Sequence, residues 1–241
     1  MQIDEEKRVV RDRVWHALDA AGVVAPPGSI GQIPSFIGAD IAARRLADLG
    51  FWHEARVVKS NPDRAQLPVR ETALLEGKIV YMAVPAMASQ APFYVLDPSA
   101  VGVEAAQSKH AATVAPTTSP TQMQPIDLVV CGTVAVDRRG VRVGKGAGYS
   151  DLEVALLTEA GTIGPDTKIV TTVHDLQVVD YEIPETEHDF SVDVIVTPKE
   201  VIYCKPRHRP AGIVWGHLTR DKIEAIPALS ARAKDREPRL C

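Results

Sequence analysis

The stretch IDLVVCGTVAVDRRGVRVGKGAGYSDLE, residues 126–153, holds the most informative succession of elements in this chain. It opens with the apolar run IDLVV at 126–130, which is typical of a strand buried on both faces of a parallel sheet. The glycine-rich run GKGAG follows at 144–148, and residues 151–159 show the pattern of a helix. The stretch therefore predicts a strand, a glycine-rich loop and a helix, in that order.

Helices and strands alternate through the rest of the chain. Apolar spacing and glycine stops predict helices at 4–21, 38–49, 69–76 and 100–108. Short runs rich in β-branched and apolar residues predict strands at 55–60, 78–84, 93–96, 169–173 and 192–196. Such alternation indicates an α/β fold, a three-layer sandwich with a mainly parallel sheet covered on both faces.

The length of 241 residues suits one large or two small domains. We expect a single α/β domain over residues 1–225 and a polar C-terminal tail over 226–241 that frays. The segment TVAPTTSPTQMQP, residues 113–125, is rich in Pro, Thr and Ser, and is interpreted as a surface loop or as a hinge between two lobes.

Composition narrows the class of protein. The formal charge of -4 argues against a general nucleic-acid binder. The three cysteines, Cys131, Cys204 and Cys241, form no C-x-x-C pair, which favours a reducing compartment and gives no zinc signature. The charged N-terminal sequence has no signal-peptide pattern, and no apolar run is long enough to span a membrane. We therefore expect a cytoplasmic protein with a small-molecule substrate, whose oligomeric state the sequence does not reveal.

The glycine-rich run has the chemistry of a phosphate-binding loop. Gly144, Gly146 and Gly148 let main-chain N–H groups turn toward an anion, and the helix behind them adds a favourable dipole. Arg142 and Lys145 supply positive charge. The pattern is neither a Walker loop nor a dinucleotide-binding loop, and the alternative interpretation is a tight structural turn. Arg142, Lys145 and the acidic residue Asp151 that follows the loop favour the interpretation as a phosphate-binding loop.

Three matches resemble the 5-formyltetrahydrofolate cyclo-ligase family, also called methenyltetrahydrofolate synthetases. The first is RVGKGAGYSD at 142–151, the second VVDYEIPETEHDFSVDVIVTP at 178–198, and the third the pair Lys7 and Arg11, four residues apart on the first predicted helix. The run IPSFIGADIAA at 33–43 is similar to the methenyltetrahydrofolate-synthetase-domain-containing branch of that family. Together the three matches extend over most of the chain.

The resemblance implies a fold like those of ribose-5-phosphate isomerases and CoA transferases. It implies that ATP phosphorylates the formyl oxygen of 5-formyltetrahydrofolate, after which ring closure gives 5,10-methenyltetrahydrofolate. Lys7 and Arg11 would contact ATP phosphates, Arg142 and Lys145 would be the catalytic cations, and Asp151 and Asp189 would hold Mg²⁺. The residues implied to wrap the triphosphate are Arg142, Val143, Gly144, Lys145, Gly146, Ala147, Gly148, Tyr149 and Ser150.

The sequence departs from the family pattern on the substrate side. Ser150 stands in place of a second Tyr, Leu152 in place of an Arg, and no glutamate matches the family's substrate contact near 65–70. Two alternatives therefore stay open: a related ATP-using enzyme acting on another heterocycle, and a non-catalytic module that binds nucleotide or folate.

Other polar residues have simpler interpretations. His174 and Asp175 end a predicted strand, where ligands of α/β sheets gather, but are expected to be hydrogen-bonded loop residues. The run KSNPDR at 59–64 is expected to be a turn without a functional role. Arg70 and Lys78 flank a predicted helix, and Lys78 is expected to be solvated at its end.

Overall fold

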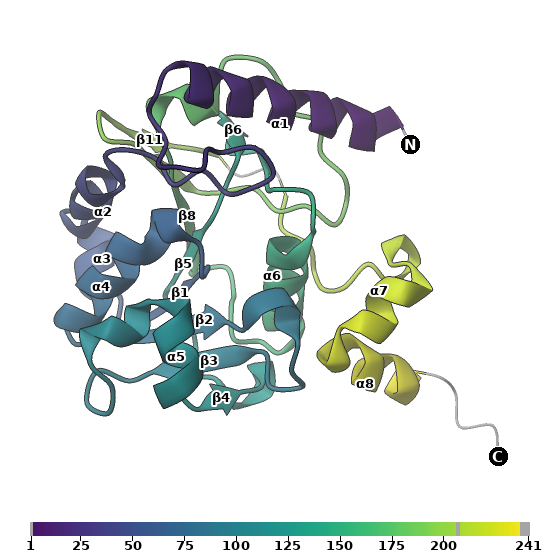
Figure 1. Cartoon of the computed structure of the whole chain (residues 1–241). Helices are drawn as coiled ribbons and strands as arrows, with labels where there is room; N and C mark the ends of the chain where they lie inside the picture. The colour runs from purple at the N-terminus through teal and green to yellow at the C-terminus, as the bar shows by residue number, and fades with distance from the viewer. Residues whose placement is uncertain (1, 206–207, 237–241) are drawn as a thin grey trace.

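The computed structural model describes residues 2–205 and 208–236. It contains a large mixed sheet with helices on both sides (Figure 1). The helices are α1 (Gln2–Ala20), α2 (Ala39–Ala47), α3 (Gly50–Glu54), α4 (Leu67–Leu75), α5 (Ser108–Val114), α6 (Tyr149–Glu159), α7 (Arg220–Ala225) and α8 (Pro227–Arg236). The strands are β1 (Val57–Ser60), β2 (Ile79–Ala83), β3 (Phe93–Leu96), β4 (Thr117–Thr118), β5 (Leu128–Cys131), β6 (Ala135–Asp137), β7 (Arg142–Val143), β8 (Lys168–Thr172), β9 (Val178–Val179), β10 (Val194–Val196) and β11 (Val201–Tyr203).

The large sheet has the order β11-β10-β8-β5-β1-β2-β3-β4. The pairs from β10 to β2 are parallel, and the outer pairs are antiparallel. The chain moves from β1 to β2 on one side and later to β5 on the other side of β1. Such a reversal of direction creates a crevice at the carboxyl ends of the strands, which is where α/β sheets place ligands.

Both faces of this sheet carry a hydrophobic core. On one face, Val58, Val80 and Leu128 pack with side chains of α2 to α5, including Trp52. On the other face, the core contains residues of β5, β8 and β10 together with α6 residues such as Val154. The predicted three-layer α/β architecture is confirmed, because helices bury their apolar faces on both sides of the same sheet.

Helix α1 covers a second, smaller sheet with the order β7-β6-β9. Its residues Val10, Val14 and Leu18 recur at helical spacing and pack against residues of this sheet. Because Lys7 and Arg11 lie four residues apart, they project from one face of α1, above the loop that follows β7.

Three of the expected segments take another form in the structure. The predicted helix 100–108 is a 3-10 turn at Val103–Ala106 followed by α5 (Ser108–Val114). The segment 113–125 contributes β4, which pairs with β3 at the edge of the large sheet. Pro227–Arg236 of the expected tail forms α8, whose Leu229 is fully buried, while residues 237–241 lie outside the described residues.

Lys78 is buried rather than solvated, and Arg70 is buried as well. Lys78 Nζ donates 2.9 Å hydrogen bonds to the carbonyls of Trp52 and Ala55, at the C-terminal end of α3, where a cation is favourable. Arg70 Nε donates to the carbonyl of Ala106 at 2.8 Å, and burial lowers the pKa of Arg70 to about 10. Both side chains satisfy carbonyls that the helix and turn ends would otherwise leave unpaired.

Candidate active site

The glycine-rich loop, residues 144–148, ends at the N-terminus of α6. Gly146 and Gly148 have φ angles of 103° and 68°, a region that favours glycine. None of the main-chain N–H groups from Gly144 to Asp151 donates a hydrogen bond to any residue that the structure describes. Consecutive free N–H groups at a helix N-terminus are the usual form of an anion-binding site.

Among the four cations predicted for this site, Arg11 and Lys145 form no ion pair with a carboxylate of the described residues. Arg11 Nε donates to the carbonyl of Gly144 at 2.7 Å, and burial lowers the pKa of this guanidinium below its ordinary value. Lys145 is exposed. Both positive charges are therefore available to an anionic ligand.

Lys7 and Arg142, the other two predicted cations, are already paired. Lys7 Nζ contacts Asp189 Oδ2 at a short distance. Arg142 Nη2 lies 2.7 Å from Asp151 Oδ1, and its guanidinium stacks over the ring of Phe190 with the Cζ atom 4.0 Å from the ring centroid. The buried Nε of Arg142 has no hydrogen-bond partner among the described residues. These two cations fix the predicted metal-binding acids in place.

Asp151 and Asp189 each keep one carboxylate oxygen, Oδ2 and Oδ1 respectively, without a hydrogen-bond partner among the described residues. Burial alone would raise the pKa of Asp189, but the hydrogen bond and charge of Lys7 hold this pKa below its ordinary value. Within the described residues, no cluster of three or more His, Cys, Asp and Glu side chains forms a ready metal cage. Asp189 Oδ1 lies 3.9 Å from His188 Nε2. Two carboxylates with an oxygen that accepts no hydrogen bond suit Mg²⁺, which takes few protein ligands and completes its shell with water and substrate phosphate.

The remaining predicted residues of the loop differ in exposure. Val143 is buried in the core beneath α1, so it supports the loop through packing. Ala147, Gly148, Tyr149 and Ser150 all line a cavity of about 240 Å³, the strand-end cavity. Its other lining residues include Asn61, Asp63, Ala83, Val84, Pro85, Gly132, Arg142, Gly144, Lys145, Asp151 and Glu153.

The strand-end cavity lies where the parallel strands β1, β2 and β5 end. Asn61 follows β1, Val84 follows β2 and Gly132 follows β5, so segments distant in sequence meet at one edge of the sheet. This is the position that the reversal of strand order around β1 predicts for a ligand.

A chain of buried polar contacts connects β1 to α6 beneath this cavity. Lys59 Nζ donates to Asn61 Oδ1 at 2.9 Å and forms a close ion pair with Glu153. Asn61 Nδ2 in turn donates to Ser150 Oγ at 2.6 Å. The sequence interpretation of residues 59–64 as a simple turn missed this arrangement, because the partner Glu153 lies far along the chain. An apolar strand that carries a lysine was the available signal.

Asp63 adds a carboxyl group to the strand-end cavity. Burial raises its pKa above the ordinary value, and the charges of Lys145 and Arg70 offset part of this increase. A methyl group at Gly132 would lie 2.6 Å from Asp63 Oδ2 and 3.2 Å from Gln66 Oε1, a buried atom without a partner among the described residues. Glycine at position 132 therefore keeps open the space into which two oxygen acceptors point.

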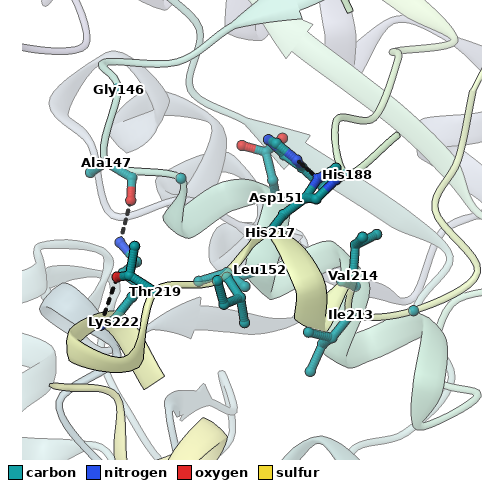
Figure 2. A pocket seen from close by; sticks show the side chains of 14 residues that line it. Gly146, Ala147, Asp151, Leu152, His188, Ile213, Val214, His217, Thr219 and Lys222 are labelled. Carbon is teal, nitrogen blue, oxygen red and sulfur yellow. Dashed lines mark hydrogen bonds between the residues drawn. The ribbon is translucent and has the colours of Figure 1, made fainter. Parts of the chain in front are cut away.

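A second cavity of about 240 Å³, the C-terminal cavity, lies on another side of the same loop (Figure 2). Ala147, Gly148 and Asp151 line both cavities. Figure 2 shows Lys222 beside Ala147, and His188 beside Asp151. The loop and the first turn of α6 thus border two cavities at once.

His174 and Asp175 line neither cavity. His174 Nδ1 accepts a hydrogen bond from the N–H of Leu176 at 3.2 Å, and Asp175 Oδ1 accepts one from Thr197 Oγ1 at 2.7 Å. Both are hydrogen-bonded loop residues, as expected from the sequence.

No helix in the described part of the chain combines the length and apolar character needed to cross a bilayer. Cys131 is a buried free thiol in the core between the sheet and α6.

Known proteins resemble this chain in sequence and fold. Methenyltetrahydrofolate synthase domain-containing proteins are 34% identical in Mus musculus and 33% in Homo sapiens, over 92% and 96% of this chain. The chain covers 62% of the length of each of these relatives. A 5-formyltetrahydrofolate cyclo-ligase from Mycolicibacterium smegmatis is 36% identical over 32% of this chain and 36% of its own length.

The solved structure of Aquifex aeolicus 5,10-methenyltetrahydrofolate synthetase shares the fold, with a TM-score of 0.54 and 19% identity. The alignment covers 88% of this chain and 99% of that one. A family model for 5-formyltetrahydrofolate cyclo-ligases matches residues 3–198, which include α1, the glycine-rich loop and Asp189. With the resemblance carried by residues 142–151, this match establishes that the chain belongs to the 5-formyltetrahydrofolate cyclo-ligase family.

Proposed function

We propose that this chain is an ATP- and Mg²⁺-dependent ligase that converts 5-formyltetrahydrofolate into 5,10-methenyltetrahydrofolate. The observation that supports it most is the run of free N–H groups from Gly144 to Asp151 at the N-terminus of α6, a run that includes Lys145 and is contacted by Arg11 at Gly144. Family membership supports the substrate, and the loop supports the use of a triphosphate.

In the proposed reaction, the formyl oxygen attacks the γ-phosphorus of ATP and ADP leaves. N10 of the folate then attacks the activated formyl carbon, the N10 proton is released to water, the ring closes, and inorganic phosphate leaves with the former formyl oxygen. Phosphoryl transfer depends mainly on positioning and on neutralising the moving charge, so no acid–base triad is required. The loop N–H groups and Lys145 supply that neutralisation, and Arg142 adds charge while it orients Asp151.

Asp151 and Asp189 are the proposed ligands of Mg²⁺, through their free carboxylate oxygens. The ion, when bound, would neutralise phosphate charge. Lys7 and Arg142 keep the two acids aligned, so these cations act on the metal site as well as on the nucleotide.

We propose that the pterin ring occupies the strand-end cavity. Asp63 lines this cavity, and a carboxyl group suits the N–H and amino edge of an aminopyrimidinone ring. Asp63 is thus our candidate for the substrate contact that the sequence pattern did not reveal near 65–70. The shared wall at Ala147, Gly148 and Asp151 would bring the formyl oxygen close to the phosphates.

The direct test incubates purified protein with 5-formyltetrahydrofolate, ATP and Mg²⁺, and follows the absorbance of the methenyl product. We expect turnover that requires ATP and is lost in Lys145→Ala. If ATP binds but no product forms, the substrate assignment is rejected and the nucleotide assignment stands.

A related ATP-using enzyme acting on another heterocycle is the second candidate. Ser150 stands where the family has its second Tyr, lines the strand-end cavity and is hydrogen-bonded to Asn61 there, so a small hydroxyl side chain takes the place of an aromatic ring. A thermal-shift screen of pterins, pyrimidines and thiazoles with ATP separates the two: stabilisation by 5-formyltetrahydrofolate alone would eliminate this candidate.

The third candidate is a non-catalytic module that binds nucleotide or folate. It predicts that Lys145→Ala and Asp151→Ala abolish binding while the unmodified chain shows no turnover of any kind. ATP hydrolysis by the unmodified chain that either substitution removes would eliminate this candidate.

We also propose a cytoplasmic location, because a reduced folate and free thiols suit a reducing compartment. Recovery of the protein in a membrane or secreted fraction after cell fractionation would contradict this location.

A further inference from the structure

The C-terminal segment, residues 212–236, forms one wall of the C-terminal cavity (Figure 2). This segment lies beyond residues 3–198, the region that the family model matches. The Homo sapiens relative matches 96% of the 241 residues, so its match extends well beyond residue 198. The segment is therefore not peculiar to this chain. A feature outside the family model therefore borders the candidate active site.

The segment is firmly held against α6. Ile226 and Leu229 pack in one cluster with Leu152 and Leu156 of α6. Glu159, at the end of α6, accepts a 2.9 Å hydrogen bond from the N–H of Ile213 and pairs with Arg232 at 2.7 Å. The cavity between segment and helix is therefore a built part of the fold.

The C-terminal cavity combines apolar walls with polar groups beside the loop. Leu152 and Ala155 of α6 line it on one side, and Ile213, Val214 and Leu218 line it from the segment. Lys222 and Thr219 lie next to Ala147 (Figure 2). A nucleotide has this same distribution of chemistry, with a flat heterocycle at one end and phosphate oxygens at the other.

Lys222 changes the electrostatic character of the loop. Its Nζ donates a hydrogen bond to the carbonyl of Ala147 and lies 4.1 Å from the centroid of the Tyr149 ring. Lys222 pairs with no carboxylate among the described residues, and burial lowers its pKa below the ordinary value. A bare carbonyl at this position would repel phosphate, whereas the ammonium group makes this side of the loop positive.

The two cavities also differ in charged lining residues. Asp63, Glu153, Arg142 and Lys145 line the strand-end cavity in addition to the shared Asp151, whereas the charged lining residues of the C-terminal cavity in the described part of the chain, histidines aside, are Asp151 and Lys222. A neutral base suits the less charged C-terminal cavity, and phosphates bound at the shared loop would meet Lys145 from one cavity and Lys222 from the other.

We propose that the C-terminal cavity is the nucleoside compartment of the ATP site. The base lies between the aliphatic walls of α6 and the C-terminal segment, and Lys222 neutralises the loop where the phosphates leave the compartment. This inference rests on the proposed function, because it assumes that the loop binds the triphosphate.

The test compares ATP with inorganic tripolyphosphate, which has the phosphates but no nucleoside. Binding of each is measured by titration calorimetry in the presence of Mg²⁺, and the ratio of the two dissociation constants reports the contribution of the nucleoside. Val214→Trp fills the cavity, Leu218→Asp places a charge in its apolar wall, and Lys222→Gln removes the cation. Lys234→Gln, an exposed lysine on α8, is the matched control.

In the unmodified chain we expect ATP to bind at least about tenfold more tightly than tripolyphosphate, a difference of about 1.4 kcal/mol. Val214→Trp and Leu218→Asp should each remove this preference and leave tripolyphosphate binding unchanged. Lys222→Gln should weaken both ligands about tenfold, and Lys234→Gln should change neither. Unfolding curves of each variant verify that the fold is retained.

Equal binding of ATP and tripolyphosphate by the unmodified chain would overturn the nucleoside compartment and leave the proposed function intact. So would a Val214→Trp or Leu218→Asp variant that keeps the full preference for ATP, or that loses 5-formyltetrahydrofolate instead. Failure of the unmodified chain to bind either phosphate ligand would overturn the loop assignment itself, and the proposed function with it.

Discussion

The glycine-rich loop contrasts with the buried polar contacts beneath the strand-end cavity, here called the polar floor, which consist of Lys59, Asn61, Ser150 and Glu153. The two regions differ in how many of their polar groups have a partner. In the floor, Lys59 and Glu153 have side chains 1% and 4% exposed and pair with each other, and Lys59 also binds Asn61. In the loop, the N–H groups find no acceptor among the described residues, and Lys145 has no carboxylate partner there. The floor is built for the fold, whereas the loop is left ready for a ligand.

The largest effect is expected from breaking the floor. Glu153→Ala leaves Lys59 buried without its counter-charge, which should destabilise the fold by about 3–5 kcal/mol. Urea unfolding measures the loss. The double variant Lys59→Met with Glu153→Ala should recover much of it, because no uncompensated charge remains. A loss below about 1 kcal/mol in the single variant would show that the pair behaves like a surface ion pair.

Substitution of the loop cation Lys145 should have the opposite result, with little effect on stability and a large effect on activity. Lys145→Ala should change the free energy of unfolding by less than about 0.5 kcal/mol, since the side chain is exposed. It should lower kcat/KM for ATP by about 10²–10³-fold, as the loss of a contact to developing charge does. Steady-state kinetics with the methenyl assay measures this, with Lys234→Gln as the control. Unchanged kinetics would remove Lys145 from the site.

A smaller effect is expected from a substitution that disturbs the main-chain conformation of the loop. Gly146 has a φ of 103°, so Gly146→Ala should add about 1–3 kcal/mol of local strain. We expect ATP affinity to fall while the cores stay intact. Gly164→Ala is the matched control, because an added methyl there meets no atom within 4 Å and its φ is ordinary. Equal ATP affinity in the two variants would mean that the loop geometry does not matter for binding.

The smallest effect is expected from pH. Lys7 holds the pKa of Asp189 in the folded chain below its value in the unfolded chain. The ion pair therefore stabilises the fold above about pH 4, and this contribution is lost as the pH falls through the folded-state pKa of Asp189. The difference in unfolding free energy between the unmodified chain and Asp189→Asn should therefore shrink between pH 7 and pH 3. A difference that is constant over this range would contradict the pairing.

Local patterns in the sequence predicted the parts of the site that are local in the fold. The spacing of Gly144, Gly146 and Gly148 before a helix predicted the loop, and the pair Lys7 and Arg11 predicted one face of α1. The strand-end cavity could not be predicted in this way. Asn61, which follows β1, and Ser150 of α6 are hydrogen-bonded there, and only the tertiary fold brings them together.

Two misassigned elements show how tertiary packing overrides local preference. The alanine-rich run at 100–108 reads as a helix, yet Ala105 and Ala106 are fully buried in a 3-10 turn against α4. The polar composition of the C-terminal tail concealed Leu229, whose burial against α6 holds α8 in place. In both segments the burial of a few residues determined which secondary structure formed.

The claim that the loop N–H groups bind a triphosphate is tested most directly by NMR of the ¹⁵N-labelled chain. Addition of ATP and Mg²⁺ should shift the amide resonances of Gly144, Gly146 and Gly148 strongly and saturably, while the amide of Gly164 stays in place. Lys145→Ala should require a higher ATP concentration for the same shifts. Glycine amides that do not move at saturating ATP would contradict the account.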